Sequence, residues 1–432
     1  MSVRLHTIRE QVTVDCNRWL EEDAASLQEI LRRKEYNPES PTPALGLDWD
    51  YSDRSLELVR SNYFIGLQWL KKKVSAILVS PKIEHLDFMT MFMKCYDNKL
   101  SKLRGHLGDI YSIDLDSPAI ETSAIDFEIT PLLIAHFLKV VKPITEKGLK
   151  KDYIIKEEAL NGKVKGKLLV GQVMKRYLRT GRQDILDCRY QDYSIDNTDN
   201  RIIKKALTFA DKYLSAHSES EKSELKQLLR SILPYFEEVS DDISIQAIKQ
   251  HKVNPLFREY SEALKVARML MSRFGYSIST VKPDIDRKSM PPFWINMPLL
   301  FELYVYALLH ERYGDQIDYH ISTYGNEIDF VKYDEQLIID TKYITSWDEA
   351  VNHDNVRQLS GYARNVALRR KIMKDEYDDT TILPCMVIYP DRKGIPINGL
   401  SPETSILSPK YAVDTYIKFF RRPISLPSME KD

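Results

Sequence analysis

The sequence predicts a multidomain α+β protein with a small β-rich N-terminal domain, a mainly helical middle and a C-terminal α/β domain. The first observation is length, because 432 residues exceed what one compact core usually holds. The second is that the spacing of apolar residues changes along the chain between the period of strands and that of helices. The third is that residues 148–181 hold five of the 15 glycines, which favours a hairpin with loops inside an otherwise helical region.

Residues 1–40 are predicted to form an N-terminal helical extension. Apolar residues follow an amphipathic pattern over residues 1–35 that ends in Leu27, Ile30 and Leu31. The run NPESPTPALG comes next, and its three prolines cannot continue a helix. We therefore expect a boundary near residue 40.

Residues 41–120 are predicted to form the small β-rich domain. The runs LELV, YFIGLQWL and VSAILV are rich in Val, Ile, Tyr and Trp, or in other apolar residues, as strands are. Residues 86–96 then change to a helical period rich in Met and Phe. We expect several strands followed by one helix.

Residues 121–285 are predicted to form a helical middle domain. Apolar residues recur at intervals of three and four over residues 128–147, 199–216, 220–236 and 255–274. This spacing places apolar side chains on one face of each helix, so the helices can share a core.

Residues 148–182 of this domain are predicted to form a projecting basic hairpin. From Lys150 to Arg182 there are 10 Lys and Arg against 3 Asp and Glu, a net charge of +7 in a chain whose total is -1. A solvated surface loop would also explain a charge run, but the interleaved Val164 and Leu168 favour contact with a partner. The basic residues assigned to this contact are Lys163, Lys165, Lys167, Lys175, Arg176, Arg179 and Arg182.

Residues 286–432 are predicted to form the C-terminal α/β domain. Residues 297–313 have the pattern of a strong helix, residues 317–345 resemble strands, and residues 350–373 are helical again. The run TILPCMVIYP, at 381–390, is a nearly all-apolar strand. This order predicts a sheet flanked by helices.

The run GNEIDFVKYDEQLIIDTKYI has two β-rich segments around a central Asp-Glu pair. If that pair forms the loop of a hairpin, the numbers of antiparallel partners sum to 669 and Asp329 faces Asp340. The strand period of two then places Lys342 on the face of Asp340, with Thr341 on the other face. Because Asp-Glu is a poor type I′ turn pair, a longer loop with a shifted register is the alternative.

Two carboxylates facing each other at about 5 Å call for a proton or a cation. A hard divalent ion, Mg²⁺ or Mn²⁺, suits them, since Mg²⁺ keeps several waters and one of these can attack a phosphodiester. Lys342 could orient or deprotonate that water and stabilise the transition state. The alternative for an isolated D-x-K is an exposed strand face that carries Asp and Lys.

Two further features favour the catalytic interpretation. Glu302 is the only charged residue in the run LLFELYVYALL, where a carboxylate needs a partner. A polar stripe shared with Tyr306 and His310 is the alternative. Gln358 and Tyr362 lie one helical turn apart, so the amide and the phenol could grip a phosphate or the DNA backbone, although ordinary surface polarity also explains such a pair.

Together these residues resemble the PD-(D/E)xK nuclease superfamily, in its branch with a Q-x-x-x-Y helix. In chain order they are Glu302, Asp329, Asp340, Thr341, Lys342, Gln358 and Tyr362. The resemblance implies that Asp329 and Asp340 ligate a metal ion and that Lys342 is the catalytic lysine. Glu302 is then the acidic residue of the preceding helix, and Thr341 a carbonyl ligand. The sequence departs from the family pattern in having no proline before the first aspartate.

Further blocks resemble the McrC family, the nuclease subunit of McrBC-type modification-dependent restriction systems, over roughly residues 60–390. These blocks are NYFIGLQWL, EKGLKKDY, NGKVKGKLL and CRYQDYSIDNTDNRIIKKAL. The resemblance implies a Mg²⁺-dependent endonuclease that cuts double-stranded DNA carrying modification of the 5-methylcytosine type. It also implies an McrB-like AAA+ GTPase oligomer as partner, whose hydrolysis the subunit stimulates through a region ahead of the nuclease domain.

No nucleotide site is expected in this chain. The run GKVKGKL, residues 162–168, is one residue short of a phosphate loop between its glycines and lacks Ser or Thr after the lysine. No signature for flipping a methylated base is evident either, so recognition of the modification is expected in another subunit.

Composition excludes several classes of protein. With 62 Lys and Arg against 63 Asp and Glu, an anionic partner must be bound by a local patch. The four cysteines lie far apart without a CxxC, which argues against a disulfide framework and a cysteine zinc site. No apolar run approaches the roughly 20 residues of a membrane span, and the N-terminus lacks a signal-peptide core. We expect a cytoplasmic protein with no membrane partner.

Two other functions stay open on the sequence. One is a stand-alone nuclease of the same superfamily in DNA repair or recombination, which would bind DNA through residues 150–182 without a motor. The other is a non-catalytic adaptor that activates an NTPase, and the intact Asp, Asp and Lys set argues against it.

Overall fold

The chain divides into two compact units, Met1–Ile129 with Asp286–Asp432, and Thr130–Ile285. The fold is that of a computed structural model. The residues that the structure describes are 3–15, 19, 21–36, 46–49, 58–97, 106–122, 129–177, 181–182, 184–217, 224–251, 258–274, 288–323, 326–345, 353–374, 377–391 and 406–429. The predicted division into four domains is not tested by this partition and stays a prediction.

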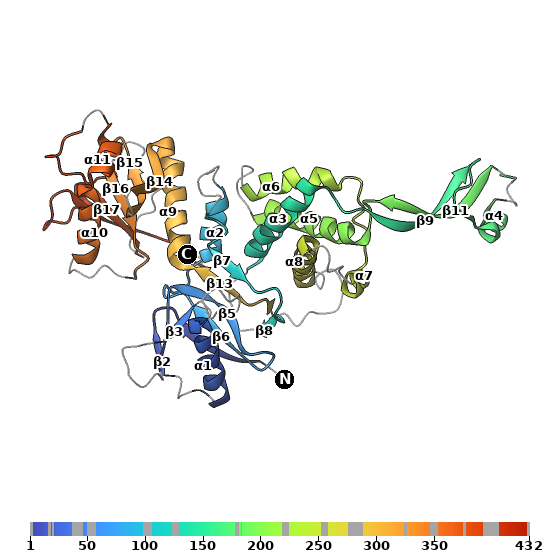
Figure 1. Cartoon of the computed structure of the whole chain (residues 1–432), viewed down its shortest axis with the longest axis horizontal. Helices are drawn as coiled ribbons and strands as arrows, with labels where there is room; N and C mark the ends of the chain where they lie inside the picture. The colour runs from blue at the N-terminus through green and yellow to red at the C-terminus, as the bar shows by residue number, and fades with distance from the viewer. Residues whose placement is uncertain are drawn as a thin grey trace. The chain divides into compact units, whose positions relative to one another are not determined.

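The first unit contains a five-stranded sheet in the order β1-β6-β5-β13-β7 (Figure 1). Its strands are β1 (Arg4–Arg9), β5 (Phe64–Lys71), β6 (Ser75–Ser80), β7 (Tyr111–Ile113) and β13 (Phe293–Asn296). β13 pairs antiparallel with both β5 and β7. Gly66 allows this close approach, because a Cβ there would lie 2.0 Å from the carbonyl oxygen of Phe293. Residues from the predicted C-terminal domain therefore complete the N-terminal sheet.

The prediction of a helical N-terminal extension is wrong for residues 4–15. These residues form β1 and β2 (Thr13–Asp15), whereas the predicted helix is confirmed only as α1 (Glu21–Tyr36). β1 pairs in parallel with β6 over its whole length, and pairing with a distant strand outweighs a local amphipathic pattern. The proline-rich boundary expected at residues 37–45 lies outside the described residues.

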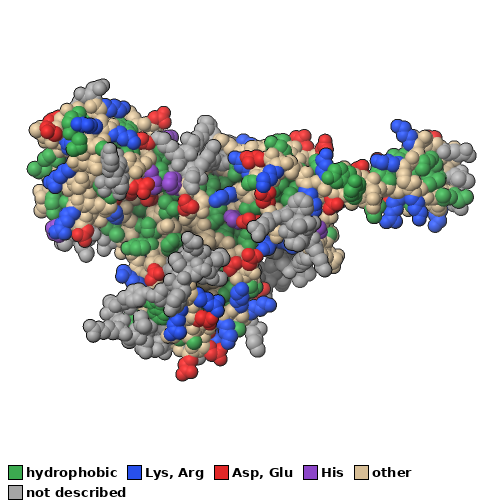
Figure 2. Space-filling model, in the orientation of Figure 1, with side chains coloured by type: hydrophobic (Ala, Val, Ile, Leu, Met, Phe, Trp, Pro, Cys, Tyr) green, Lys and Arg blue, Asp and Glu red, His purple; other side chains and the backbone are tan. Residues whose placement is uncertain are grey.

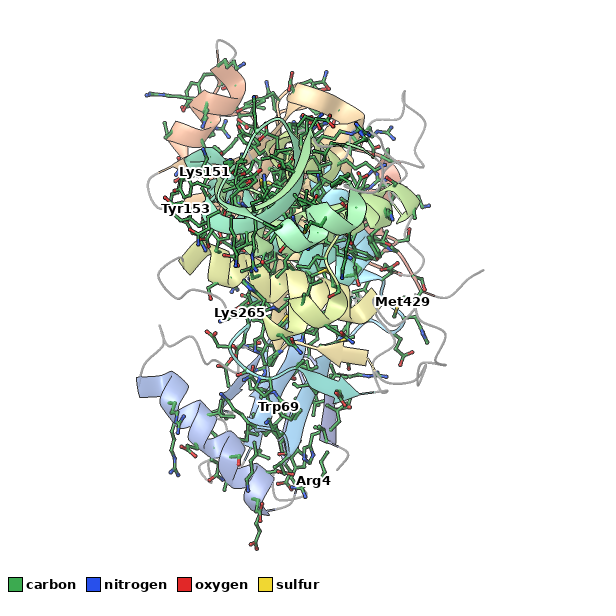
Figure 3. The ribbon with its side chains drawn as sticks, turned by 90° about the vertical axis from the view of Figure 1, so that its right-hand side faces the viewer. Arg4, Trp69, Lys151, Tyr153, Lys265 and Met429 are labelled. Atoms are coloured by element: carbon green, nitrogen blue, oxygen red, sulfur yellow. The ribbon has the colours of Figure 1, made fainter. Side chains whose placement is uncertain are left out.

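Helix α1 lies along one face of this sheet. Figure 3 shows it beside the strands that carry Arg4 and Trp69. Leu27 and Leu31 of the helix are buried in one cluster with Trp294 of β13. Burying such side chains contributes roughly 1.5–3 kcal/mol each, so the helix is held to the sheet mainly by this apolar face.

Shorter elements complete the N-terminal part of the first unit, and the predicted strands and helix are confirmed there wherever the structure describes them. A three-stranded sheet has the order β2-β4-β3, and β8 pairs antiparallel with β12. The elements are β3 (Leu47–Trp49), β4 (Leu58–Ser61), α2 (Phe88–Asp97), β8 (Ile120–Thr122) and β12 (Lys288–Met290).

The C-terminal part of the first unit is a second five-stranded sheet, in the order β14-β15-β16-β17-β18. The first three strands are antiparallel and the last three parallel. The strands are β14 (Ile317–Thr323), β15 (Asn326–Lys332), β16 (Leu337–Thr341), β17 (Cys385–Pro390) and β18 (Phe419–Ile424). The accompanying helices are α9 (Met297–Tyr313), η5 (Gly314–Gln316), α10 (His353–Arg364), α11 (Val366–Met373) and η8 (Pro409–Tyr411). The predicted sheet flanked by helices is confirmed.

The predicted register of the β15-β16 hairpin is confirmed. Phe330 pairs with Ile339 and Val331 with Ile338, so each pair sums to 669. Gln336 N–H donates to the carbonyl of Tyr333 at 3.1 Å, and Gln336 has a φ of 50°. A left-handed residue directly after the Asp-Glu pair lets the turn close without the shifted register.

The second unit is mainly helical, and the predicted helices are confirmed. Its helices are α3 (Thr130–Lys147), α4 (Val170–Arg176), α5 (Thr198–His217), α6 (Glu224–Ile232), η4 (Leu233–Phe236), α7 (Ile245–Gln250) and α8 (Arg258–Phe274). A small sheet in the order β10-β11-β9 extends away from the helices of this unit (Figure 1). Its strands are β9 (Asp152–Asn161), β10 (Lys167–Leu168) and β11 (Ile185–Ser194). The glycine-rich hairpin is therefore confirmed, with α4 as an unexpected helix near its tip.

Among the described helices, none combines the length and the apolar character needed to cross a lipid bilayer.

Candidate functional site

The two predicted aspartates lie where the β15-β16 ladder ends. Asp329 is partly buried and Asp340 is buried. Thr341 donates to Asp329 Oδ2 twice, from its backbone N–H and from its hydroxyl, each at 2.7 Å. Lys342 Nζ lies 2.9 Å from Asp340 Oδ2. The structure therefore brings Asp329, Asp340, Thr341 and Lys342 together, and the predicted common face of Asp340 and Lys342 is confirmed.

The carboxylates of this cluster perturb one another. Burial, and then the charges of Asp340 and Glu302, raise the pKa of Asp329 to about 7, against the hydrogen bonds from Thr341. Burial also raises the pKa of Asp340, although Lys342 opposes the shift. Burial disfavours the Lys342 ammonium, but the two aspartates outweigh it and raise the pKa of Lys342. Such mutual shifts at a partly open cluster of charges are typical of functional sites.

Glu302 reaches this cluster from α9, which is buried along most of its length. Its Oε1 accepts a hydrogen bond from Tyr319 O–H at 2.9 Å and contacts His320 Nε2 at 2.8 Å. Tyr306 is buried and stacks on Phe330. The partners of Glu302 therefore come from β14, and the alternative of a polar stripe along α9 does not describe its surroundings.

His320, like its neighbour Tyr319, contacts Glu302 and was missed by sequence reasoning. Its φ is 50°, and it falls between the ladder pairs Tyr319 with Phe330 and Ile321 with Ile328, opposite Asp329. The hydrogen bond with Glu302 raises the pKa of His320, against burial. A left-handed residue interrupts the alternation of side chains along β14, so no strand pattern could place this imidazole beside Glu302.

The Q-x-x-x-Y pair lies on α10 as predicted. Gln358 is exposed and donates from Nε2 to the hydroxyl of Tyr362 at 2.9 Å. Tyr362 is partly buried and packs against the core beneath α10. Its phenol lies close enough to Lys342 to contribute to the raised pKa of that lysine. Helix α10 therefore borders the cluster, and its exposed Gln358 side chain is accessible to a ligand.

No group of three or more His, Cys, Asp or Glu side chains in the described ranges is arranged to hold a metal ion by itself. Any metal at the cluster must therefore draw on fewer side chains of these four types, together with backbone oxygens or water.

The basic residues of the hairpin are exposed but differ in their contacts. Lys165 lies 3.7 Å from an Asp192 carboxylate oxygen, with its Nζ 3.9 Å from the Tyr190 ring centre. Arg176 pairs with Asp187 at 3.6 Å. Other assigned residues are exposed and have no ion pair with any described residue, namely Lys163, Lys167, Lys175 and Arg182. Arg179 lies outside the described residues.

Apolar side chains are exposed on the same hairpin. Val164 is 61% exposed, Val170 54% and Met174 55%. Figure 2 shows Lys and Arg side chains around the far end of the hairpin with hydrophobic side chains among them. A surface that is basic and apolar at once suits a protein partner better than a nucleic-acid backbone alone.

A family model described as "McrBC 5-methylcytosine restriction system component" matches residues 59–371. The chain belongs to this family.

Two solved structures similar to this McrBC-family chain come from Thermococcus gammatolerans. One is the refined half-complex from a tetradecameric assembly of McrB AAA+ hexamers with bound McrC, at a TM-score of 0.38 and 14% identity, covering 98% of this chain and 94% of that chain. The other is the cryo-EM structure of the McrBC complex, at a TM-score of 0.29 and 13% identity, covering 71% and 88%. No curated protein matches the chain.

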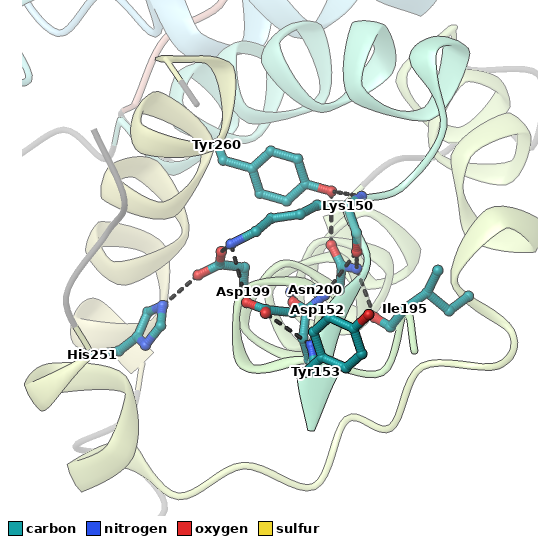
Figure 4. A network of polar contacts seen from close by, with 9 residues as sticks. Lys150, Asp152, Tyr153, Ile195, Asp199, Asn200, His251 and Tyr260 are labelled. Atoms are coloured by element: carbon teal, nitrogen blue, oxygen red, sulfur yellow. Dashed lines mark hydrogen bonds and ion pairs between the residues drawn. The ribbon is translucent and has the colours of Figure 1, made fainter. Parts of the chain in front are cut away.

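The root of the hairpin in this McrBC-family chain is held by a buried polar network (Figure 4). Asn200 Nδ2 donates to the carbonyls of Lys150 at 2.9 Å and Ile195 at 2.6 Å, and its Oδ1 accepts from Tyr260 O–H at 2.9 Å. Lys150 Nζ pairs with Asp199 at 2.9 Å. Both ends of the hairpin are thereby fixed to helices α5 and α8.

Proposed function

We propose that this chain is the Mg²⁺-dependent DNA endonuclease component of an McrBC-type restriction system. The observation that carries the proposal is the convergence of Asp329, Asp340 and Lys342 where the β15-β16 ladder ends, with Glu302 close enough to perturb Asp329. This order and spacing resemble those of a PD-(D/E)xK active site, which supports the proposal. The family match supplies the system to which such a nuclease would belong.

The donor atoms of the cluster suit Mg²⁺ or Mn²⁺. Asp340 Oδ2 is buried without a well-aligned hydrogen-bond donor among the described residues. Both hydrogen bonds from Thr341 to Asp329 reach the same oxygen, Oδ2. Each carboxylate therefore retains acceptor capacity that a cation could use. Mg²⁺ commonly binds through one or two carboxylates and keeps its waters, so a complete protein cage is not required. Asp329 and Asp340 would hold the ion, with the Thr341 carbonyl as a further ligand and Glu302 reaching it through a bound water. Bound there, it would supply an activated water and neutralise charge on the phosphate.

The remaining residues act on the DNA. The Lys342 ammonium, held against Asp340, can orient a water and stabilise charge that develops on the phosphoryl oxygens. Gln358 is exposed on α10 and can donate to the DNA backbone, with its side chain oriented by Tyr362. His320 and Tyr319 hold Glu302 in position through Oε1.

The proposed partner is an McrB-like AAA+ GTPase oligomer. In the assembly from Thermococcus gammatolerans, McrB AAA+ hexamers carry bound McrC. The exposed basic and apolar hairpin supports a partner of this kind, because phosphate contacts alone need no exposed Val164 or Met174. We propose that the hairpin contacts the GTPase and that the chain itself binds no nucleotide.

The test is cleavage of DNA containing 5-methylcytosine by the chain with its AAA+ partner, GTP and Mg²⁺. Asp340→Asn keeps the size of the side chain and removes its charge. It should lower the cleavage rate about 10²-fold or more and leave partner binding unchanged. Cleavage at the wild-type rate would reject the active-site assignment, and robust cleavage by the isolated chain without nucleotide would favour the stand-alone nuclease.

A further inference from the structure

Glu10 is a buried carboxylate that the proposed reaction does not use. It follows the end of β1, is 1% exposed, and its Oε2 accepts no hydrogen bond from any residue that the structure describes. Its Oε1 accepts from the backbone N–H of Lys82 and from the hydroxyl of Tyr343, each at 2.9 Å. Burial is the main reason that the pKa of Glu10 is raised to about 7. A half-satisfied buried carboxylate is destabilising, so its presence calls for a role other than stability.

Lys82 contacts the same tyrosine from the end of β6. Its Nζ donates to the backbone carbonyl of Tyr343 at 2.6 Å and to Gln11 Oε1 at 2.7 Å. The same ammonium lies 4.1 Å from the centre of the Tyr343 ring. Two residues from the N-terminal sheet therefore hold Tyr343 at its hydroxyl, its ring and its carbonyl.

Tyr343 connects these contacts to the candidate active site. It directly follows Lys342, whose own N–H donates to the carbonyl of Ile388 at 2.9 Å. Its ring is buried and packs on Phe301, with ring centres 5.8 Å apart, and Phe301 directly precedes Glu302. Tyr343 thus supports both the strand end that presents Lys342 and the helix turn that presents Glu302.

We propose that Glu10, Lys82 and Tyr343 form a tether through which the N-terminal sheet positions Lys342 and Glu302. Tyr343 is then a positioning residue, since it acts through its neighbours and does not itself reach the DNA. The proposal rests on the proposed nuclease function and adds to it a role for the N-terminal strands. An error of about 1 Å in the placement of a reacting group can cost 10²-fold in rate, so a small displacement at Tyr343 is sufficient to matter.

The experiment compares Tyr343→Phe, Glu10→Gln and the double variant in the complex with the AAA+ partner. We expect the single-turnover cleavage rate to fall about tenfold or more, with DNA KM and partner GTP turnover unchanged. The double variant should cost no more than the larger single effect, because both changes act on the same hydrogen bond: Tyr343→Phe removes its donor, and Glu10→Gln replaces its charged acceptor with a neutral amide. In the isolated chain, hydrogen exchange of the amides at residues 342–345 should accelerate in both variants, independently of any cleavage.

Tyr333→Phe is the matched control. It removes a tyrosine–carboxylate hydrogen bond of 3.1 Å, to Asp318, near the turn of the same β15-β16 hairpin. It should keep the cleavage rate. If it lost as much activity as Tyr343→Phe, the effect would be a general loss of stability and the tether would be rejected. Glu10→Gln can fail to fold because the site is buried, and Tyr343→Phe, which removes one oxygen, then decides the matter.

Lys342→Ala, measured in parallel, separates the two proposals. If Lys342→Ala is inactive while Tyr343→Phe cleaves and exchanges like the wild type, the tether is wrong and the nuclease proposal stands. If Lys342→Ala cleaves normally, the proposed active site is wrong, and the tether falls with it.

Discussion

The candidate active site and the basic hairpin both carry many charges, but the charged side chains are buried or partly buried at the site and mostly exposed on the hairpin. At the site, Asp340 is 4% exposed and its neighbours shift one another's pKa. On the hairpin, Lys163 and Lys167 are exposed and have no described ion pair. Burying charge costs free energy, and carboxylates buried together with shifted pKa values are typical of sites that bind a ligand or carry out a reaction, whereas exposed charge remains available to a partner. The first pattern indicates chemistry, and the second indicates recognition.

Removal of the buried charges is the strongest way to test this comparison. Asp329→Ala and Lys342→Ala should each lower DNA cleavage about 10²-fold or more, because each removes a group that the transition state needs. The partner's GTP turnover should stay unchanged, since the hairpin is intact. The measurement is cleavage and GTP hydrolysis in one reaction, with the fully exposed carboxylate of Asp315 replaced by Ala as control. Loss of GTP turnover in the active-site variants would show that the active site and the hairpin do not act independently.

The root of the hairpin should respond in stability rather than in chemistry. Asn200→Ala removes three hydrogen bonds, two to the carbonyls of Lys150 and Ile195 and one from the Tyr260 hydroxyl, and we expect a loss of about 2–3 kcal/mol in the free energy of unfolding. Chemical denaturation measures it. Asn161→Ala, at the exposed end of β9, is the control and should lie within about 0.5 kcal/mol of the wild type. Equal losses from both would show that the network does not hold the hairpin.

Replacing the exposed lysines of the hairpin should change the partner's GTP turnover but not DNA binding. Lys163→Ala with Lys167→Ala should lower stimulated GTP turnover about tenfold, or about 1.4 kcal/mol, because exposed charges contribute modestly. DNA affinity should be retained. Lys165 is left unchanged because it contacts Asp192 and Tyr190.

The charge-matched control for this pair is Lys142→Ala with Lys212→Ala, two exposed lysines on helices α3 and α5. It should leave GTP turnover at the wild-type level. Unchanged turnover in the hairpin variant, with weaker and less salt-dependent DNA binding, would assign the hairpin to DNA.

The smallest expected effect is the pH dependence of stability at Glu10. Its pKa is raised to about 7, chiefly by burial, so the folded state binds more protons than the unfolded state between pH 4.5 and 7, and stability falls as pH rises. Between pH 6 and 7.5 the loss amounts to about 1 kcal/mol. Lys82, whose pKa burial lowers to about 8, offsets little of it below pH 7.5. Denaturation of Glu10→Gln should lack this component, and an identical pH slope in both proteins would contradict the buried carboxylate.

Local pattern was sufficient where a feature depends on neighbours in sequence. The helical spacing of residues 297–313 and the alternation on either side of the Asp-Glu pair specified α9 and the β15-β16 register. Side-chain direction in a regular hairpin follows from the register alone. For this reason Asp340 and Lys342 could be placed on one face from the sequence.

Local pattern failed where partners are distant. Residues 4–9 pair with β6. Residues 293–296 join the same sheet, although the whole second unit separates them in sequence from β5, the strand they pair with. The strand partners of neither segment could therefore be predicted from the residues around it. The partners of Glu302 were missed because His320 leaves the regular strand conformation. The tether of Tyr343 to Glu10 joins residues 333 positions apart, and no spacing encodes such a contact.

The sequence by itself determined the order of the elements, the spacing of the acidic and basic residues and the charge of the hairpin, because each follows from periodicity or counting over short windows. Only the tertiary structure decided which charges are buried, which lysines are engaged and which strands support the site. Burial and pairing depend on segments brought together by folding, and desolvation, which sets the pKa of Asp329 and of Glu10, does not exist until those segments meet.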